Sequence, residues 1–150
     1  MKIEEGDIRS IMVIDDDRDE FLLILDAMKQ IDPGITVYFA DSCEEAKRFR
    51  NHKVDLVLLD INMPQHDGFS WLRSIREKGY HDLPIVMYTN SMSPLHITKA
   101  YNDGANLYYV KPDNFKRLIN GLSKLLSMDW SQPAKITENY HHSGKSLTFN

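Results

Sequence analysis

The feature that most constrains the fold of this chain is a fully apolar run inside residues 54–59. Its centre, Leu56-Val57-Leu58-Leu59, has no polar position, so both faces of the segment require cover. A strand of this kind is typical of a parallel sheet with helices on both sides. Asp60 follows directly and places a carboxylate at the carboxyl end of the strand. Open α/β sheets form their binding sites along that edge.

Strand and helix patterns alternate along most of the chain. Short apolar runs predict strands at residues 11–14, 35–40, 54–59, 84–88 and 107–110. Apolar residues spaced three or four apart predict helices from Asp17 to just before Pro33 and at residues 115–126. Start and stop signals predict three further helices, at residues 42–51, 68–78 and 93–104. Asp17 with Glu20, and Ser42 with Glu45, have the spacing of capping boxes at two helix starts. This alternation implies right-handed crossovers and a parallel sheet, but periodicity leaves the strand order open.

Length and composition limit the classes of protein. The 150 residues suit one domain, and a net charge of −4 gives no bulk attraction to nucleic acid. No apolar run approaches the roughly 20 residues that span a bilayer, and residues 1–7 lack the apolar stretch of a signal peptide. The single cysteine, Cys43, excludes an internal disulfide and fits a reducing compartment. We therefore expect a cytoplasmic protein that binds neither membrane nor nucleic acid.

The regular pattern ends near Ser127. The polar segment from residue 128 to residue 150 contains Pro133 and Gly144, and its favoured interpretation is a frayed tail. The alternative is an arm that packs on a partner through aromatic residues, namely Trp130, Tyr140 and Phe149. In either case the segment is too short to fold as a separate DNA-binding or catalytic domain.

Polar residues follow four of the predicted strands. Asp15 and Asp16 follow the first, Asp60 the third, Thr89 the fourth and Lys111 the fifth. Carboxylates that share a pocket raise one another's pKa unless a cation joins them, and Mg²⁺ is the cation that takes few carboxylates and keeps several waters. A carboxylate nucleophile, a metal ion and a lysine are the groups that phosphoryl transfer needs.

Four segments in this order resemble the receiver domain of two-component response regulators. They are Val13-Ile14-Asp15-Asp16-Asp17, residues 56–68 (LVLLDINMPQHDG), residues 84–89 (PIVMYT) and residues 108–112 (YYVKP). The resemblance covers roughly residues 9–127 and implies a flavodoxin-like, doubly wound (βα)5 fold with strand order 2-1-3-4-5. It also implies that residues 128–150 are a tail and that there is no output domain.

The resemblance assigns the phosphoacceptor and the metal ligands. Asp60 would accept a phosphoryl group from the phosphohistidine of a sensor histidine kinase or of a histidine phosphotransfer protein. Asp16 would bind Mg²⁺ directly and Asp15 through water. Asp60 itself and the backbone carbonyl of Asn62 would complete the set of ligands.

The resemblance also assigns the residues that respond to phosphorylation. Thr89 and Lys111 would contact the phosphoryl group, and the Lys111-Pro112 peptide is expected to be cis. Thr89 would move inward, and Tyr108 would rotate into the vacated space. Asn90 departs from the family pattern, which has a small residue after the threonine, and puts the rate of phosphoryl access in doubt.

The expected function is that of a stand-alone response regulator that switches its surface for a downstream protein. It would catalyse only transfer to its own aspartate and slow loss of the phosphoryl group, so it is not expected to be an enzyme in the usual sense. Pairing into a homodimer through helix 4, strand 5 and helix 5 is a further option. Residues 109–112 and 125–130 resemble stand-alone receivers paired with phytochrome-like or other hybrid histidine kinases.

Two alternatives remain open on the sequence. A small phosphatase of the haloacid-dehalogenase type would explain the order of Asp15, Asp17, Thr89 and Lys111, but would leave Asp60 without a role. A binding module that acts without phosphorylation would use the same fold.

Overall fold

Five parallel strands form one sheet in the order β2-β1-β3-β4-β5. The structure is a computed structural model that describes residues 7–63 and 67–149. The order confirms the flavodoxin-like topology predicted above. The strands are β1 (Ser10–Ile14), β2 (Thr36–Ala40), β3 (Leu56–Leu59), β4 (Ile85–Thr89) and β5 (Leu107–Val110).

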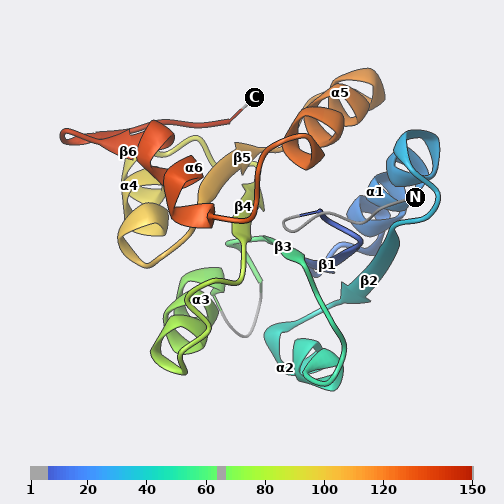
Figure 1. Ribbon diagram of the computed structural model, residues 1–150, viewed down its shortest axis with the longest axis horizontal. Coiled ribbons are helices and arrows are strands. Elements are labelled where there is room, and N and C mark those ends of the chain that lie inside the picture. Colours follow the sequence, from blue (N-terminus) through green and yellow to red (C-terminus); the bar gives the residue numbers. More distant parts are fainter. Residues whose placement is uncertain (1–6, 64–66, 150) are drawn as a thin grey trace.

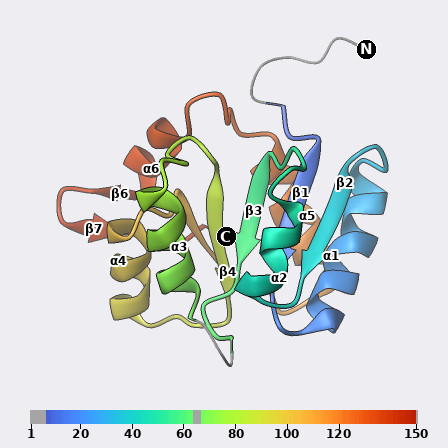
Figure 2. The same ribbon diagram turned by 90° about the horizontal axis from the view of Figure 1, so that it is seen from below.

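Helices cover both faces of the sheet (Figures 1 and 2). On one face lie α1 (Arg18–Ile31) and α5 (Phe115–Leu126). On the other lie α2 (Cys43–Ala46), α3 (Gly68–Glu77) and α4 (Pro94–Asn102). The strands in the middle of the sheet are therefore buried on both sides, as the apolar run in β3 predicts.

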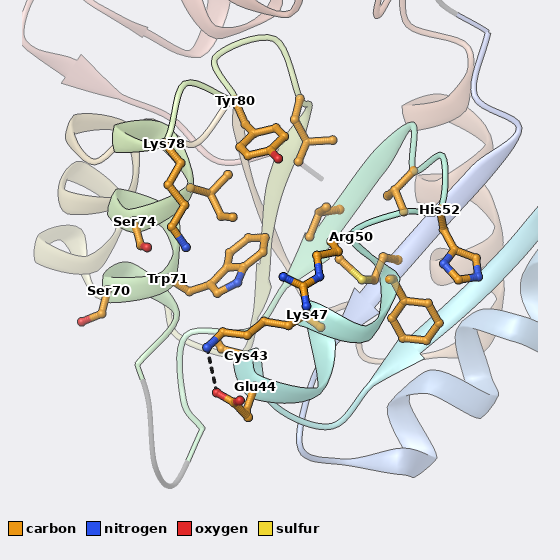
Figure 3. A pocket seen from close by; sticks show the side chains of 17 residues that line it. Cys43, Glu44, Lys47, Arg50, His52, Ser70, Trp71, Ser74, Lys78 and Tyr80 are labelled. Carbon is orange, nitrogen blue, oxygen red and sulfur yellow. Dashed lines mark hydrogen bonds and ion pairs between the residues drawn. The ribbon is translucent and has the colours of Figure 1, made fainter.

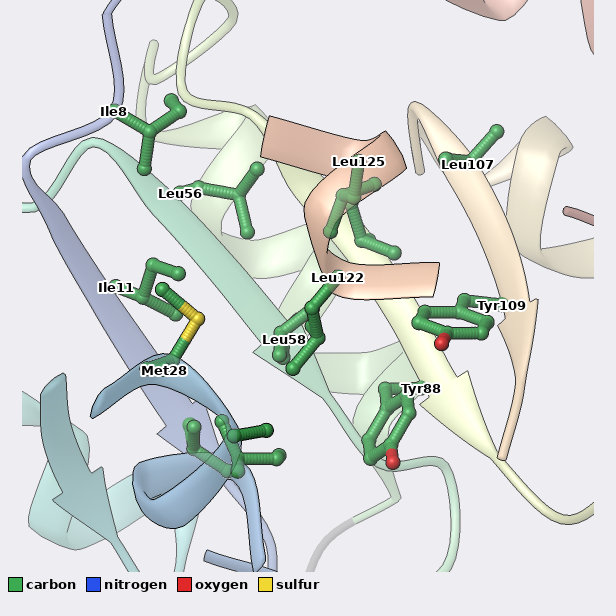
Figure 4. Packing of buried hydrophobic residues seen from close by; sticks show 14 of the residues in the cluster. Ile8, Ile11, Met28, Leu56, Leu58, Tyr88, Leu107, Tyr109, Leu122 and Leu125 are labelled. Atoms are coloured by element: carbon green, nitrogen blue, oxygen red, sulfur yellow. The ribbon is translucent and has the colours of Figure 1, made fainter. Parts of the chain in front are cut away.

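Successive residues of each strand belong to different cores. In β3, Leu56 and Leu58 pack into the cluster under α1 and α5, whereas Val57 and Leu59 face the helices of the opposite side. Figure 4 shows the first cluster, in which Met28 of α1 and Leu122 of α5 meet the strand residues. The residues that follow the strands lie at the carboxyl edge of the sheet, and several of them are polar.

The helix expected at residues 42–51 is shorter than predicted. Ser42 caps α2, because its Oγ accepts a hydrogen bond from the Glu45 backbone N–H at 3.0 Å. After Ala46 the chain tightens into a 3-10 helix, η1 (Lys47–Phe49). In this turn the ring of Phe49 contacts the rings of Tyr38 and His52, at 5.2 and 5.4 Å between centroids, and those two rings also contact each other.

The C-terminal segment is ordered, so the favoured interpretation of a frayed tail is wrong. It contains α6 (Pro133–Tyr140) and a short hairpin of β6 (His141–His142) and β7 (Lys145–Ser146). Beyond the hairpin, Phe149 forms an isolated parallel bridge with Tyr109 of β5. In Figure 1 the segment lies beside β5, between α4 and α5. Within residues 7–63 and 67–149, no helix has both the length and the apolar character to cross a membrane.

Candidate functional site

The carboxyl edge of the sheet brings together the predicted polar residues. Asp15 follows β1, Asp60 follows β3, Thr89 ends β4 and Lys111 follows β5. Asp15, Asp60 and Thr89 are almost completely buried, with 1%, 7% and 0% of their surface exposed. Buried polar groups require partners, and the site supplies them from neighbouring strands.

Lys111 is the cation that joins two of the carboxylates. Its Nζ lies 2.8 Å from Asp15 Oδ2 and 3.7 Å from Asp60 Oδ2. The other oxygen of Asp15 accepts a hydrogen bond from the Asp17 backbone N–H at 2.9 Å. These contacts hold Asp15 and Lys111 in place and leave Asp60 with the looser ion pair.

Asp15, Asp16 and Asp60 form a cluster that fits a metal ion. Each offers a carboxylate oxygen, and these oxygens lie within 4.8 Å of one another. Lys111 is the one cationic side chain paired with Asp15 and Asp60 in the described part of the chain, so the cluster retains an excess of negative charge. Oxygen ligands with this charge suit a hard divalent cation. The exposed Asp16 gives the cluster an open side toward solvent.

Burial and charge shift the ionisation of the site. Desolvation raises the pKa of Asp60, and nearby Asp15 adds to that effect. Lys111 opposes it, as do hydrogen bonds from the Thr89 hydroxyl and the Asn62 backbone. For Lys111 itself, desolvation favours a lower pKa, but the hydrogen bond to Asp15 and the charges of Asp60 and Asp15 outweigh it and raise the pKa. The lysine therefore stays charged at neutral pH.

The loop after Asp60 depends on a glycine. Gly68 donates its backbone N–H to the Ile61 carbonyl at 3.0 Å, and a Cβ at Gly68 would collide with the Asp60 backbone carbonyl. Asp67 caps α3 by accepting from the Ser70 N–H. Asn62 is exposed beside Asp60, whereas residues 64–66 of the sequence motif lie outside the described residues.

Tyr108 lies in the inward orientation. The side chain is completely buried, and its hydroxyl donates a hydrogen bond of 2.8 Å to the Ser91 carbonyl. The Ser91 N–H in turn donates to Thr89 Oγ1 at 3.4 Å. A chain of contacts therefore joins Tyr108 to the threonine that faces Asp60.

The expectation of a cis Lys111-Pro112 peptide is wrong. None of the described peptide bonds is cis. The trans form of an X-Pro bond is favoured by about 0.5–1 kcal/mol, so a cis bond requires support from its surroundings. With the trans bond, the Lys111 N–H still pairs with the Thr89 carbonyl at 2.8 Å, and its side chain still reaches Asp15.

Glu20 is a site residue that sequence reasoning did not identify. The capping-box interpretation is wrong in detail, because Asp17 accepts from the Asp19 N–H instead. Glu20 is half-buried and close enough to the site to feel the charges of Lys111 and Asp15. Desolvation raises its pKa, although Lys111 opposes the shift. The available signal was its position in the first turn of α1, four residues after Asp16.

A separate cavity of about 710 Å³ lies between the α2–η1 segment and α3 (Figure 3). Its wall includes Cys43, Phe49 and Trp71, and it shares no lining residue with the carboxylate site. Burial raises the pKa of the Cys43 thiol to about 11, so the thiol is protonated at neutral pH. A protonated thiol is a weak nucleophile, so Cys43 is not activated for reaction in this cavity wall.

The sequence model of the response regulator receiver domain matches residues 11–123. This chain belongs to that family. Among curated relatives, the transcriptional regulatory protein CpxR of Klebsiella pneumoniae subsp. pneumoniae (strain HS11286) is 30% identical to this receiver over 132 residues. The matched region is 87% of this chain and 55% of the relative. The receiver thus spans about half the length of the curated relatives it matches.

Solved receivers share the fold. The phosphorylated cyanobacterial phytochrome response regulator RcpA has a TM-score of 0.71 at 23% identity, over 79% of this chain and 91% of that one. The Vibrio cholerae chemotaxis protein CheY4 has a TM-score of 0.67 at 26% identity, over 78% of this chain and 98% of that one. These similarities support the assignment of the sheet order and the helical layers.

Proposed function

We propose that this receiver accepts a phosphoryl group on Asp60 in a Mg²⁺-dependent reaction and thereby changes its surface for a downstream protein. The observation that best supports this proposal is the environment of Asp60, which is buried at the sheet edge beside Lys111, Thr89 and two further carboxylates. The donor is a sensor histidine kinase or a histidine phosphotransfer protein. Outside this transfer and slow autodephosphorylation, we expect no enzymatic turnover.

The described residues account for binding and transfer. One Asp60 oxygen forms the new P–O bond while the P–N bond to the donor histidine breaks. Lys111, already 3.7 Å from Asp60, pairs with the phosphoryl oxygens, and the Thr89 hydroxyl donates to them. Asp15, Asp16, Asp60 and the Asn62 carbonyl would hold Mg²⁺, which would supply positive charge to the phosphoryl group.

The response is a shift between two existing arrangements. When Thr89 approaches the phosphoryl group, Tyr108 occupies the space beside it, and the inward Tyr108 is held by Ser91. Phosphorylation shifts this equilibrium only as far as its contacts differ between the two arrangements. We propose a cytoplasmic regulator. A phytochrome-like kinase as the donor and a homodimer of this chain remain predictions.

The test is chemical phosphorylation. Purified protein is incubated with acetyl phosphate and Mg²⁺, and intact mass is measured. We expect one phosphoryl group on the wild type and on Asp26→Asn, a control that changes an exposed aspartate of α1, and none on Asp60→Asn. Equal labelling of Asp60→Asn, or an unlabelled wild type, would refute the proposal.

The same samples separate the alternatives. A haloacid-dehalogenase-like phosphatase would hydrolyse a generic phosphate ester with a dependence on Asp15 but not on Asp60. A module that acts without phosphorylation would bind its partner equally before and after labelling. The match to the receiver family favours neither alternative.

A further inference from the structure

The C-terminal arm, defined here as residues 128–149, is docked on the free edge of β5. Phe149 is completely buried, and its ring lies edge-on to Tyr109 with 5.0 Å between centroids. Lys124 of α5 places its Nζ 5.3 Å from the centre of the same ring. Phe149 thus anchors the end of the arm between β5 and α5, as Figure 1 indicates for the chain path.

The first part of the arm is fixed by one residue before α6 and by one residue within it. Trp130 is buried and donates its indole N–H to the Leu125 carbonyl at 2.9 Å. Thr137 Oγ1 lies 3.1 Å from the carbonyl of Asn106 and accepts from the Asn106 side-chain amide at 3.2 Å. Asn106 directly precedes β5, so α6 is tied to the strand that carries Tyr108.

The arm engages both backbone polar groups of Tyr108. The Phe149 N–H donates to the Tyr108 carbonyl at 2.7 Å. The Tyr108 N–H donates to the Tyr101 hydroxyl at 3.2 Å, and that hydroxyl donates to the Leu147 carbonyl at 2.5 Å. The Tyr101 ring is also stacked on His141 of the arm, with 5.1 Å between centroids and 6° between planes. Tyr108 is therefore clamped by the arm, directly and through α4.

The other end of Tyr108 reaches the phosphoacceptor. Its hydroxyl binds the Ser91 carbonyl, and the Ser91 N–H contacts Thr89. The Thr89 hydroxyl lies close enough to Asp60 to lower the pKa of that carboxyl. A continuous path of contacts is not by itself coupling, because coupling requires an element with two arrangements that both sites bias. Tyr108 is such an element under the function proposed above.

We propose that the docked arm is an intramolecular regulator of the Asp60 site, which favours phosphorylation by holding Tyr108 inward. The proposal rests on the proposed function, since it assumes that phosphorylated Asp60 also favours the inward Tyr108. Linkage is reciprocal, so phosphorylation must tighten the arm by the factor by which the arm favours phosphorylation. The arm is then a second ligand of the switch, supplied by the chain itself.

Two variants loosen the arm without replacing a residue of the Asp60 site. Tyr101→Phe removes the hydroxyl between Leu147 and Tyr108 and keeps the ring that stacks on His141. Phe149→Ala removes the buried anchor. Lys145→Ala is the matched control, because it changes an exposed side chain of the same arm.

The experiment measures both directions of the linkage. The protein is incubated with limiting acetyl phosphate and Mg²⁺ until labelling is at steady state. We expect the ratio of labelled to unlabelled protein to fall about fivefold or more in both variants. Lys145→Ala should match the wild type. Amide hydrogen exchange of the peptide that contains Phe149 should slow on phosphorylation of the wild type, and should not change in Asp60→Asn.

The outcomes distinguish the two proposals. An unlabelled wild type refutes the proposed function. A labelled wild type whose ratio is unchanged in Tyr101→Phe, with unchanged exchange at Phe149, refutes the arm proposal alone. A higher ratio in the variants would also refute it, because the arm would then oppose phosphorylation.

Circular dichroism shows whether Phe149→Ala is folded. If it is unfolded, the result for Tyr101→Phe alone tests the arm proposal. A variant effect that disappears on dilution would assign the arm to a second copy of the chain and overturn the intramolecular regulator.

Discussion

At the scale of single residues, the surroundings of Asp60 lower the stability of the folded chain. Asp60 is buried among carboxylates, and its nearest cation, Lys111, is committed to Asp15 at the shorter distance. Desolvation raises the Asp60 pKa, so the folded chain holds the ionised form less favourably than the unfolded chain does. Asp60, the proposed phosphoacceptor, should therefore lower the stability of the protein at neutral pH.

Asp60→Asn should be more stable than the wild type at pH 7, by about 1 kcal/mol. A carboxyl with a raised folded pKa favours folding below its ordinary pKa and loses that contribution as the pH rises through the folded pKa. The gain in Asp60→Asn should thus shrink as the pH falls toward 4, where the wild-type carboxyl gains protons in both the folded and the unfolded state. Urea denaturation from pH 4 to pH 7 measures it; a gain independent of pH would contradict the electrostatic cause.

Tyr109→Phe should stabilise the fold or leave it unchanged, within about 1 kcal/mol. The buried Tyr109 hydroxyl has no hydrogen-bond partner among the residues that the structure describes, and burial raises its pKa to about 12. Removal of an unpaired hydroxyl relieves a desolvation cost and preserves the ring contact with Phe149. Thermal unfolding provides the measurement. A loss above 1 kcal/mol would show that the hydroxyl has a partner in solution.

At the scale of elements, helix starts differ in how they are held. Asp67→Ala should destabilise the protein by about 1 kcal/mol, because it removes the carboxylate that accepts the Ser70 N–H and caps α3. Ser93→Ala is the control: Ser93 precedes α4, but its side chain makes no capping hydrogen bond. Chemical denaturation of both variants compares them. Equal losses would mean that the cap at Asp67 contributes nothing specific.

Elements specified by local patterns were predictable from the sequence. Each strand has an apolar run of its own, and β5 begins and ends at the residues that its run predicts. The site followed from the same logic, since Asp15, Asp60, Thr89 and Lys111 all follow or end a strand. Local patterns sufficed here because parallel strands place their carboxyl ends along one edge.

Features that depend on distant contacts were not predictable. The arm has no period that indicates burial, and its anchors Trp130 and Phe149 become buried only against α5 and β5. Glu20 reads as a capping residue until α1 is placed beside Lys111. In the 3-10 turn that follows α2, Phe49 packs against Tyr38 of β2, a contact that local patterns do not indicate.

At the scale of the whole molecule, bound Mg²⁺ should stabilise the fold. A ligand that binds only the folded state adds about 1.4 kcal/mol when its free concentration is tenfold above its Kd. We expect Mg²⁺ to raise the Tm of the wild type and of Asp26→Asn, but to raise that of Asp16→Asn less, since Asp16 belongs to the acidic cluster. Thermal denaturation across a Mg²⁺ series is the measurement. An equal response in Asp16→Asn would exclude this residue as a ligand.

The bridge between Phe149 and Tyr109 also affects how the molecule meets its neighbours. β5 is the last strand of the sheet, and an uncovered last strand offers its backbone groups as a template for strands of other molecules. The arm occupies part of that template through the Phe149 N–H. A chain trimmed to residues 9–127, the boundary that the sequence pattern suggests, should therefore self-associate more readily than one that extends through Phe149. Light scattering at matched concentrations would show the difference.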